Sequence, residues 1–567
     1  MSKISLHWMK GDGLMVMGDG LMLTVENQQS TLHNSSPITI MPFDFDHLLN
    51  QRKSQTLLQY SVTFHRFLLF LLLNRMILLL LPCKSNVCKQ IRFSMKFKHA
   101  TLVSAAALSA LTACNTSNNE QIDTEKPNIV FILADDLGYG DFGCFGQQTI
   151  KTPNIDALAK AGMICTQSYS GTTVSAPSRA CLLTGLNSGH APIRGNFEIY
   201  PEGQMAIPEN TNTIFKLFKE NGYATGVFGK WGLGAPKSEG SPENQYVDEF
   251  FGYNCQRLSH SYYPDYLYHD SARIELKANA KANAGTYAPD TIQQLTLQFI
   301  EKHKDEPFFL FVPCILPHAE LIAPNDSLLI QYEGRFKETP FQGCDYGCKS
   351  FRIGGYGSQK EPLAAYAAMV SRYDFYVGQI VEKLEDTGLI DNTLIIVTSD
   401  NGPHWEGGNN PDFFNSNGIY RGYKRDLYEG GIRIPTVMAW KGKISPDTQS
   451  DFMFAFWDYM PTFAELIGAE NPECDGISIK PLLLGKAQTE HNYLYFEFQE
   501  NGGAQCVRKG DWKLIKLNVS NEPIFELYNI KDDPSETNNL IDSNKETFEN
   551  LKLILENERT DDPNWQF

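Results

Sequence analysis

From Pro127 to about residue 400 the chain alternates between continuous apolar runs and longer amphipathic segments, and this alternation limits the possible folds more than any other feature. A short, unbroken apolar run indicates a strand buried on both faces, and such strands belong to parallel sheets covered by helices. We therefore predict an α/β fold whose large, mixed, mostly parallel sheet is sandwiched by helices. The predicted strands are residues 128–133, 223–228, 308–312 and 393–397, and the predicted helices are 153–161, 213–220, 289–303 and 362–386.

The pattern changes at about residue 487. Short alternating runs follow at 493–498 and 512–516, and an amphipathic segment covers 544–556. Alternation with a period of two indicates strands that are buried on one face only, as in antiparallel sheets. We predict a catalytic domain at 127–486 and a C-terminal subdomain at 487–567, in which a smaller antiparallel sheet is accompanied by one helix.

The first 126 residues have a different character. Residues 1–94 lack a steady period, and their apolar run at 67–81 is interrupted by a polar pair. From Met95 the chain reads MKFKHATLVSAAALSALTAC, which has the charge, apolar core and small residues of a signal peptide. Its end at Cys114 resembles a bacterial lipoprotein box.

These features predict a lipoprotein signal peptide at 95–113, a lipidated cysteine at Cys114 and a polar tether at 114–126. A leader cannot work more than ninety residues into a chain, so we expect Met95 to be the true start and residues 1–94 to be translated upstream sequence. The protein would then be exported to the periplasm, or to the outer membrane and cell surface, and held on the membrane by its lipid. The alternative is a signal anchor at 67–81 followed by an alanine-rich linker.

The formal net charge of −17 argues against a surface that binds nucleic acid or anionic membranes. A small anionic substrate would need a locally positive pocket. Of the 12 cysteines, nine lie beyond Cys114, and an odd number cannot be fully paired. Cys344 and Cys348 are close enough for a small loop disulfide, but no spacing resembles a zinc or iron–sulfur site.

Polar side chains follow two of the predicted strands. Asp135 and Asp136 come directly after the first strand, and Asp400 and Asn401 follow the strand at 393–397. Ligands of open α/β sheets bind at the carboxyl ends of strands. Three carboxylates and an amide oxygen are hard ligands that suit Ca²⁺ or Mg²⁺. Alternatively, each of these short motifs only forms a turn.

The segment Ser175-Ala-Pro-Ser-Arg-Ala-Cys-Leu-Leu-Thr-Gly185 places a serine just before a proline suited to the first turn of a helix. An anionic nucleophile or substrate is stabilised at a helix start, and Arg179 adds positive charge there. Alternatively, Ser175 only caps the helix. The segment also resembles the signature of type I sulfatases, in which the first residue, cysteine or serine, is oxidised to formylglycine.

Further motifs of that family follow in its order over residues 127–540. Gly229-Lys230-Trp231 matches the lysine motif, Pro317-His318 the central histidine, and Lys424 stands five residues before Glu429. Asp135, Asp136, Asp400 and Asn401 match the two metal pairs, which formylglycine 175 completes as a calcium site.

One position departs from the family pattern. Many sulfatases have a histidine that contacts the formylglycine where this chain has Gly232. His260 and His404 are candidates to replace it or to hold substrate, and His190 is a third. Each could equally be an ordinary surface or core histidine.

The resemblance implies that the hydrated aldehyde of residue 175 attacks the sulfur of a sulfate ester, with Asp400 as base. Calcium and Arg179 would lower the cost of ionising the attacking hydroxyl, Lys230, Lys424 and calcium would neutralise charge on the sulfuryl oxygens, and His318 would protonate the departing alcohol. One hydroxyl forms a covalent sulfo-enzyme and the other expels sulfate. Because the residue is a serine, its oxidation would require the oxygen-independent, radical type of maturating enzyme of anaerobic bacteria.

An anchored bacterial sulfatase with Tyr262 and Tyr263 near the expected mouth suits sulfated sugars, and we expect exo-acting hydrolysis of a sulfated saccharide. Two alternatives stay open. One is a phosphonate or phosphodiester hydrolase of the same superfamily, and the other is a glycan-binding lipoprotein without catalysis.

Overall fold

The computed structural model describes residues 5–9, 13–18, 21–25, 126–200 and 202–567. The chain divides into two compact units, Met1–Glu120 and Gln121–Phe567. In the first unit, strands β1 (Ser5–Met9), β2 (Gly13–Gly18) and β3 (Leu21–Val25) form an antiparallel sheet. The predicted signal peptide, Cys114 and the run at 67–81 lie outside the described residues. Within the described part of the chain, none of the helices has both the length and the apolar character needed to span a bilayer.

The second unit is built on a ten-stranded sheet whose order is β10-β9-β8-β7-β11-β4-β12-β13-β5-β14. Its central strands β8, β7, β11, β4 and β12 are parallel, whereas β9, β10 and β13 run against their neighbours. The strands are β4 (Asn128–Ala134), β5 (Met163–Cys165), β7 (Ala224–Lys230), β8 (Glu249–Tyr253), β9 (Tyr266–His269), β10 (Ala272–Glu275), β11 (Phe308–Pro313), β12 (Thr393–Ser399), β13 (Thr436–Ala439) and β14 (Thr448–Ser450). The predicted mixed, mostly parallel sheet is confirmed.

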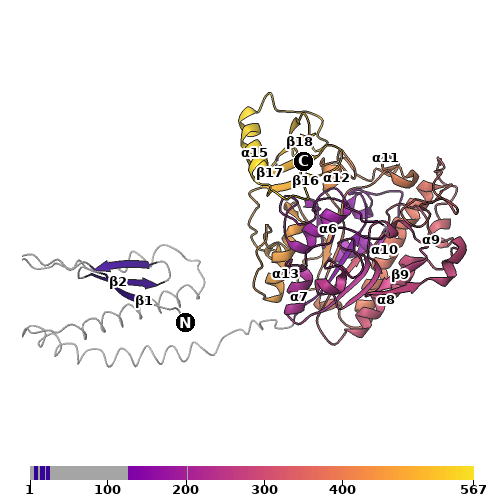
Figure 1. Ribbon diagram of the computed structural model, residues 1–567, viewed down its shortest axis with the longest axis horizontal. Helices are drawn as coiled ribbons and strands as arrows, with labels where there is room; N and C mark the ends of the chain where they lie inside the picture. Colours follow the sequence, from indigo (N-terminus) through magenta and orange to yellow (C-terminus); the bar gives the residue numbers. More distant parts are fainter. Residues whose placement is uncertain (1–4, 10–12, 19–20, 26–125, 201) are drawn as a thin grey trace, which may run out of the picture. The chain divides into compact units, whose positions relative to one another are not determined.

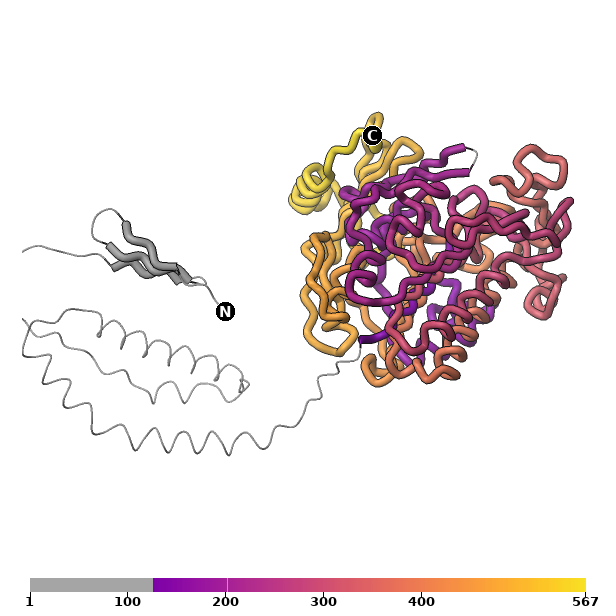
Figure 2. The backbone as a smooth tube through the Cα atoms, turned by 60° about the horizontal axis from the view of Figure 1, so that its bottom comes forward, coloured from indigo at the N-terminus to yellow at the C-terminus, as the bar shows by residue number. Residues whose placement is uncertain are grey.

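Helices cover both faces of this sheet (Figures 1 and 2). Alternate residues of β4 enter different cores, because successive side chains of a strand point to opposite faces. Ile129 and Phe131 pack with α6, α7 and α13, whereas Val130 and Ile132 pack with α5, α8 and α10. These helices are α5 (Pro153–Ala161), α6 (Ser175–Thr184), α7 (Ile214–Glu220), α8 (Ala288–Lys302), α10 (Pro362–Asp386) and α13 (Tyr459–Ile467). The four predicted helices agree with α5, α7, α8 and α10 to within one residue at each end.

A second, four-stranded antiparallel sheet follows at the C-terminal end, where Figure 1 labels it beside the orange-to-yellow helix α15. Its strands are β16 (Leu494–Phe498), β17 (Ala504–Lys509), β18 (Trp512–Leu517) and β19 (Ile524–Asn529), and α15 spans Lys545–Asn557. The buried ammonium of Lys513 in β18 lies 3.0 Å from Glu429 and 2.8 Å from Glu536. Glu429 begins the short helix α12 (Glu429–Ile432), so this buried ion cluster joins the small sheet to the segment after Lys424.

Candidate active site

The start of helix α6 brings Ser175 to the carboxyl edge of the large sheet, and every residue of this helix is buried. The Ser175 hydroxyl donates to Oδ1 of Asp135 over 2.9 Å, and Nζ of Lys230 lies 3.4 Å from it. Ser178 makes a different contact, because its hydroxyl donates to the carbonyl oxygen of Asp400 over 2.6 Å. Of the two serines in the motif, Ser175 is the one that faces the charged side chains.

Three aspartates meet where β4 and β12 end. Ala134 and Ser399 are paired in register, so Asp135 and Asp400 leave neighbouring strands at the same level. Asp136 has a φ of 62°, and its backbone N–H donates to Oδ1 of Asp400 over 3.1 Å. A residue other than glycine rarely adopts this left-handed conformation, so its surroundings must hold it there.

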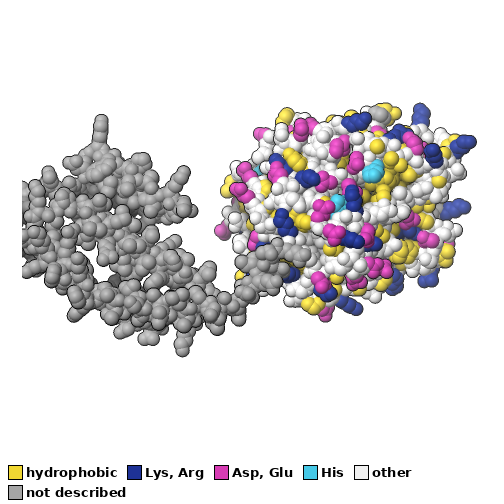
Figure 3. Space-filling model, turned by 90° about the horizontal axis from the view of Figure 1, so that it is seen from below, with side chains coloured by type: hydrophobic (Ala, Val, Ile, Leu, Met, Phe, Trp, Pro, Cys, Tyr) yellow, Lys and Arg dark blue, Asp and Glu magenta, His cyan; other side chains and the backbone are white. Residues whose placement is uncertain are grey.

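Each aspartate has its own cation. Nε and Nη2 of Arg179 lie 3.0 and 2.9 Å from Oδ2 of Asp400. Nζ of Lys230 lies 2.7 Å from Oδ2 of Asp135, and Nζ of Lys424 lies 2.7 Å from Oδ2 of Asp136. On the face shown in Figure 3, acidic and basic side chains are interspersed.

Burial and neighbouring charges shift the pKa values of these groups in opposite directions. Burial, aided by the nearby charge of Asp135, raises the pKa of Asp400 to about 7. Burial would also raise the pKa of Asp135, but the positive charge of Lys230 lowers it well below its usual range. Burial lowers the pKa of Lys230, whereas the attraction of Asp136 outweighs burial at Lys424 and raises its pKa. Carboxylates in one site with opposite pKa shifts are typical of catalytic centres.

Asn401 completes the oxygen cluster. Its Nδ2 donates to Oδ1 of Asp136 over 2.7 Å, and its own Oδ1 is buried without a hydrogen-bond partner. A buried oxygen without a partner costs free energy, and a bound cation would satisfy it. The three carboxylates and this amide oxygen therefore fit a hard divalent ion such as Ca²⁺.

His318 adds an imidazole to this cluster, which differs from the predicted all-oxygen set. Potential ligand atoms of Asp135, Asp136 and His318 lie within 4.8 Å of one another, and His318 Nε2 is 3.2 Å from Oδ2 of Asp136. Its Nδ1 donates to the carbonyl oxygen of Ala319 over 2.5 Å, and Nε2 accepts from Nζ of Lys424 over 3.2 Å. Burial, together with the charge of Lys424, lowers the pKa of His318 well below 6.5.

The other three candidate histidines have different surroundings. His260 stacks on His318 with ring centroids 5.0 Å apart, and its Nδ1 donates to the carbonyl oxygen of Gly354. His404 also stacks on His318, with ring centroids 5.8 Å apart, but both of its ring nitrogens have backbone partners, so it supports the ring of His318. His190 contacts Asp475 and the backbone of Glu558, which places it in the packing of the C-terminal segment.

The expectation that Tyr262 lies near the mouth of the site is wrong. Tyr262 is fully buried, and its hydroxyl oxygen lies 2.7 Å from the carbonyl oxygens of both Ile315 and His318, so its single hydrogen is shared between these two acceptors. Tyr263 is partly exposed and packs edge-on against Tyr287. Tyr262 therefore holds the loop that carries His318, a role that the order of residues alone does not reveal.

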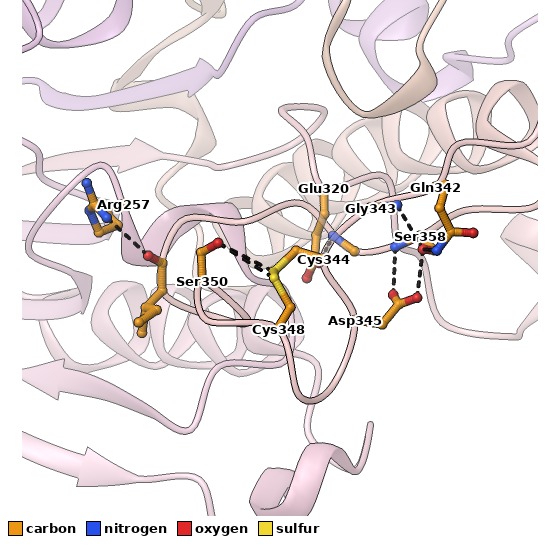
Figure 4. The surroundings of a disulfide bond; sticks show 11 residues. Arg257, Glu320, Gln342, Gly343, Cys344, Asp345, Cys348, Ser350 and Ser358 are labelled. Carbon is orange, nitrogen blue, oxygen red and sulfur yellow. Dashed lines mark hydrogen bonds between the residues drawn. A yellow bond between two sulfur atoms is a disulfide. The ribbon is translucent and has the colours of Figure 1, made fainter.

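A small disulfide loop is connected to the site through Tyr356. Cys344 and Cys348 are bonded, as predicted, and Figure 4 shows Ser350 within hydrogen-bond reach of both sulfurs. The backbone N–H of Cys344 donates to the carbonyl oxygen of Tyr356 over 2.7 Å. The Tyr356 ring lies 5.1 Å from that of His260 and 6.1 Å from that of His318. Sequence reasoning missed Tyr356, which no motif marks.

Glu406 is a second residue that the sequence did not single out. Its carboxylate lies 3.3 Å from Nζ of Lys424 and 2.5 Å from Nη1 of Arg425. Burial would raise the pKa of Glu406, but the charge of Lys424 lowers it to about 2. Lys424 is thus held between Asp136 and Glu406. In the sequence, Glu406 was marked only by its position two residues after the candidate His404.

Gly232 lies against Gln256. A β-carbon at position 232 would meet Nε2 of Gln256 at 2.4 Å, and Gly232 has a φ of 76°. Gln256 Nε2 is buried and has no hydrogen-bond partner. The amide of Gln256, rather than a histidine side chain, therefore occupies the space beside Gly232.

Comparison with known proteins gives consistent matches. A family model described as Sulfatase matches residues 127–469, and one described as N-sulphoglucosamine sulphohydrolase, C-terminal, matches 418–561. N-acetylgalactosamine-6-O-sulfatase of Bacteroides thetaiotaomicron is 29% identical over 520 residues, covering 80% of this chain and 97% of that protein. Human arylsulfatase A is 31% identical over 423 residues, covering 68% and 74%. The crystal structure of Ps i-CgsB in complex with k-i-k-neocarrahexaose has a TM-score of 0.64 at 28% identity, covering 76% of this chain and 92% of that one.

Proposed function

Because the chain belongs to the sulfatase family of sulfuric ester hydrolases, we propose that it removes sulfate from carbohydrates by means of a formylglycine made from Ser175. The observation that carries this proposal is the position of the Ser175 hydroxyl, 2.9 Å from Asp135 and 3.4 Å from Lys230 at a buried helix start. Ser178 is already hydrogen-bonded to the backbone of Asp400, which supports Ser175 as the modified residue.

Asp135, Asp136, Asp400 and Asn401, together with residue 175, would hold one calcium ion. Calcium would supply positive charge that stabilises oxyanions of the sulfuryl group. The support is the partnerless Oδ1 of Asn401 beside the three carboxylates, and the close approach of potential ligand atoms of Asp135, Asp136 and His318.

In the proposed reaction two aspartates have different roles: one accepts a hydrogen bond from residue 175, and the other takes up a proton. Asp135 accepts the hydrogen bond from residue 175, and its lowered pKa keeps it ionised as an orienting acceptor. Asp400 would take up the proton, because burial and the nearby charge of Asp135 raise its pKa above the usual range of an aspartate. Arg179, with two N–H groups on one oxygen of Asp400, fixes the orientation of that carboxylate.

Lys230 and Lys424 would bind the sulfuryl oxygens, since they are the ammonium groups that face Ser175 and His318. The departing alcohol would take its proton from Nε2 of His318. Burial and the charge of Lys424 lower the pKa of His318, which favours its neutral form before substrate binds. A bound sulfate group adds negative charge near this ring, which raises that pKa again and favours the protonated form.

Oxidation and hydration of Ser175 would supply two hydroxyls on one carbon, one to attack sulfur and one to expel sulfate. Mass spectrometry of the tryptic peptide from the native host tests this proposal. The peptide should lack two hydrogens at Ser175 and react with a hydrazine. Ser175→Ala should abolish turnover. In Ser178→Ala, the same mass measurement should still find the modification at Ser175. High activity with an unmodified Ser175 would instead favour a direct serine nucleophile, as in phosphate ester hydrolases.

The proposed modification implies partners and a location. We propose that a radical-type, oxygen-independent maturating enzyme oxidises Ser175 before folding, because the folded protein buries all of α6. We also propose export as a lipoprotein anchored at Cys114, with Met95 as the start. Terminal peptides from cells should begin at a lipid-modified Cys114, and folded protein that retains residues 1–94 would contradict this assignment.

The proposed substrate class is a sulfated saccharide, from whose terminal sugar unit the sulfate ester is hydrolysed (exo action). It is supported by the bacterial relative that is named for N-acetylgalactosamine 6-sulfate esters and covers 80% of this chain. A screen of mono- and oligosaccharides sulfated at defined positions, with N-acetylgalactosamine 6-sulfate among the first, measures sulfate release directly. Release from aryl sulfates but from none of the saccharides would contradict the substrate class and leave the sulfatase chemistry standing.

A further inference from the structure

An exposed tryptophan stands at the edge of the active site. Trp405 is 49% exposed, whereas His404 before it is completely buried and stacks on His318. Glu406 after it contacts Nζ of Lys424 at 3.3 Å. Trp405 is therefore fixed on both sides by residues that contact the groups proposed to release the alcohol.

A second aromatic ring braces Trp405. The Tyr423 ring lies 5.4 Å from the Trp405 ring at an angle of 76°, and its hydroxyl donates to Asp412. Tyr423 directly precedes Lys424, so both rings are attached to backbone that the site holds in place. Trp405 is exposed and Tyr423 partly exposed, and a pair of rings with restricted motion loses little conformational entropy when a ligand packs on it.

Charged residues lie close in sequence to both rings, since Glu406 follows Trp405 and Arg425 lies two residues after Tyr423. Nη1 of Arg425 lies 2.5 Å from Glu406, and its Nε lies 3.4 Å from Glu500, which follows strand β16 of the small sheet. Arg425 is partly exposed. An aromatic surface beside an arginine and two carboxylates offers a stacking face, donors and acceptors together, which matches the C–H faces and hydroxyls of a sugar.

We propose that Trp405 and Tyr423, together with Arg425 and Glu500, form a subsite for the sugar unit next to the one that loses its sulfate. This inference rests on the proposed function and deepens it. The sulfuryl group would lie among Ser175 and the two lysines, so the alcohol leaves on the side of His318. The rest of the saccharide must continue outward from that side, where His404 and Glu406 place Trp405.

The test compares two substrates: the sulfated monosaccharide that the wild-type enzyme cleaves fastest, and an oligosaccharide that ends in the same unit. Trp405→Ala should lower kcat/KM for the oligosaccharide about tenfold or more, mainly through KM, and leave the monosaccharide within about twofold. Trp405→Phe should recover part of the loss. Phe375→Ala is the matched control, because Phe375 is an aromatic residue 44% exposed on helix α10.

A second measurement does not depend on turnover. The desulfated oligosaccharide should quench the fluorescence of Trp405, and the Trp405→Ala variant should bind it at least about tenfold more weakly. Equal losses on both substrates, or unchanged binding of the desulfated oligosaccharide, would overturn the subsite. If the wild-type enzyme releases sulfate from no saccharide yet binds the desulfated oligosaccharide through Trp405, the proposed substrate reaction fails while the subsite stands.

Discussion

The side-chain amide nitrogen of Gln256 lies 2.4 Å from the point that a β-carbon on Gly232 would occupy. Gly232 also has a φ of 76°, a conformation that side chains rarely adopt. Any larger residue at position 232 must therefore move Gln256 and accept a strained backbone. Gly232 lies two residues after Lys230, the residue that we propose binds the sulfuryl group, so we expect such movement to disturb this lysine.

We expect Gly232→Ala to lower the free energy of unfolding by about 1–3 kcal/mol and to reduce activity. The steric part of this loss should be relieved in the double variant Gly232→Ala/Gln256→Ala, whereas the part due to the backbone should persist. Urea unfolding of the two single variants and the double variant measures the coupling between these residues. Strictly additive losses would show that Gln256 does not limit the space at position 232.

We expect His318→Gln to slow the hydrolysis of sugar sulfates by about 10²–10⁴ in kcat, because a sugar alkoxide needs a proton in order to leave. The loss should be much smaller with 4-nitrophenyl sulfate, whose phenolate leaves without one. Kinetics on both substrates separate proton donation from binding. A loss of the same size on both would assign His318 to binding of the sulfuryl group.

The metal site is tested with two buried aspartates. Asp136→Asn should abolish the rise in melting temperature that calcium gives the wild-type protein, because binding to the folded state stabilises it. Asparagine tolerates the left-handed backbone at φ 62°, so the change removes charge with little strain. Asp141→Asn is the control: Asp141 is equally buried, bonds to Ser416 and Tyr366, and should keep the calcium response. Calcium content after exhaustive dialysis provides the second readout, and a calcium response retained by Asp136→Asn would contradict the assignment.

His190 should make stability depend on pH. Its hydrogen bond to Asp475, outweighing burial, raises its pKa above 6.5. The stabilisation is therefore fully present below about pH 6.5 and is lost as the pH rises through the raised pKa. The difference in unfolding free energy between the wild type and His190→Gln should be largest below about pH 6.5 and shrink as the pH rises above it. A difference that stays constant, or that widens with pH, would show that Asp475 does not hold His190 in its charged form.

Much of the fold could be predicted because local patterns decide it. The runs at 128–133 and 393–397 are apolar throughout, and only a strand covered on both faces buries every side chain of such a run. Because adjacent parallel strands end at the same edge, the residues after them had to meet. The register of Ala134 with Ser399 does bring Asp135 and Asp400 together.

The order of residues along the chain thus determined the α/β sheet, the strand-end carboxylates and the position of Ser175 at a helix start, since each follows from neighbours in sequence. Only the tertiary structure decided that His318 joins the carboxylates, that Glu406 holds Lys424, that Tyr262 is buried and that Gln256 fills the space beside Gly232. These contacts lie between loops far apart in the chain. Loop conformations depend on the packing of the whole unit, and no local pattern of residues encodes that packing.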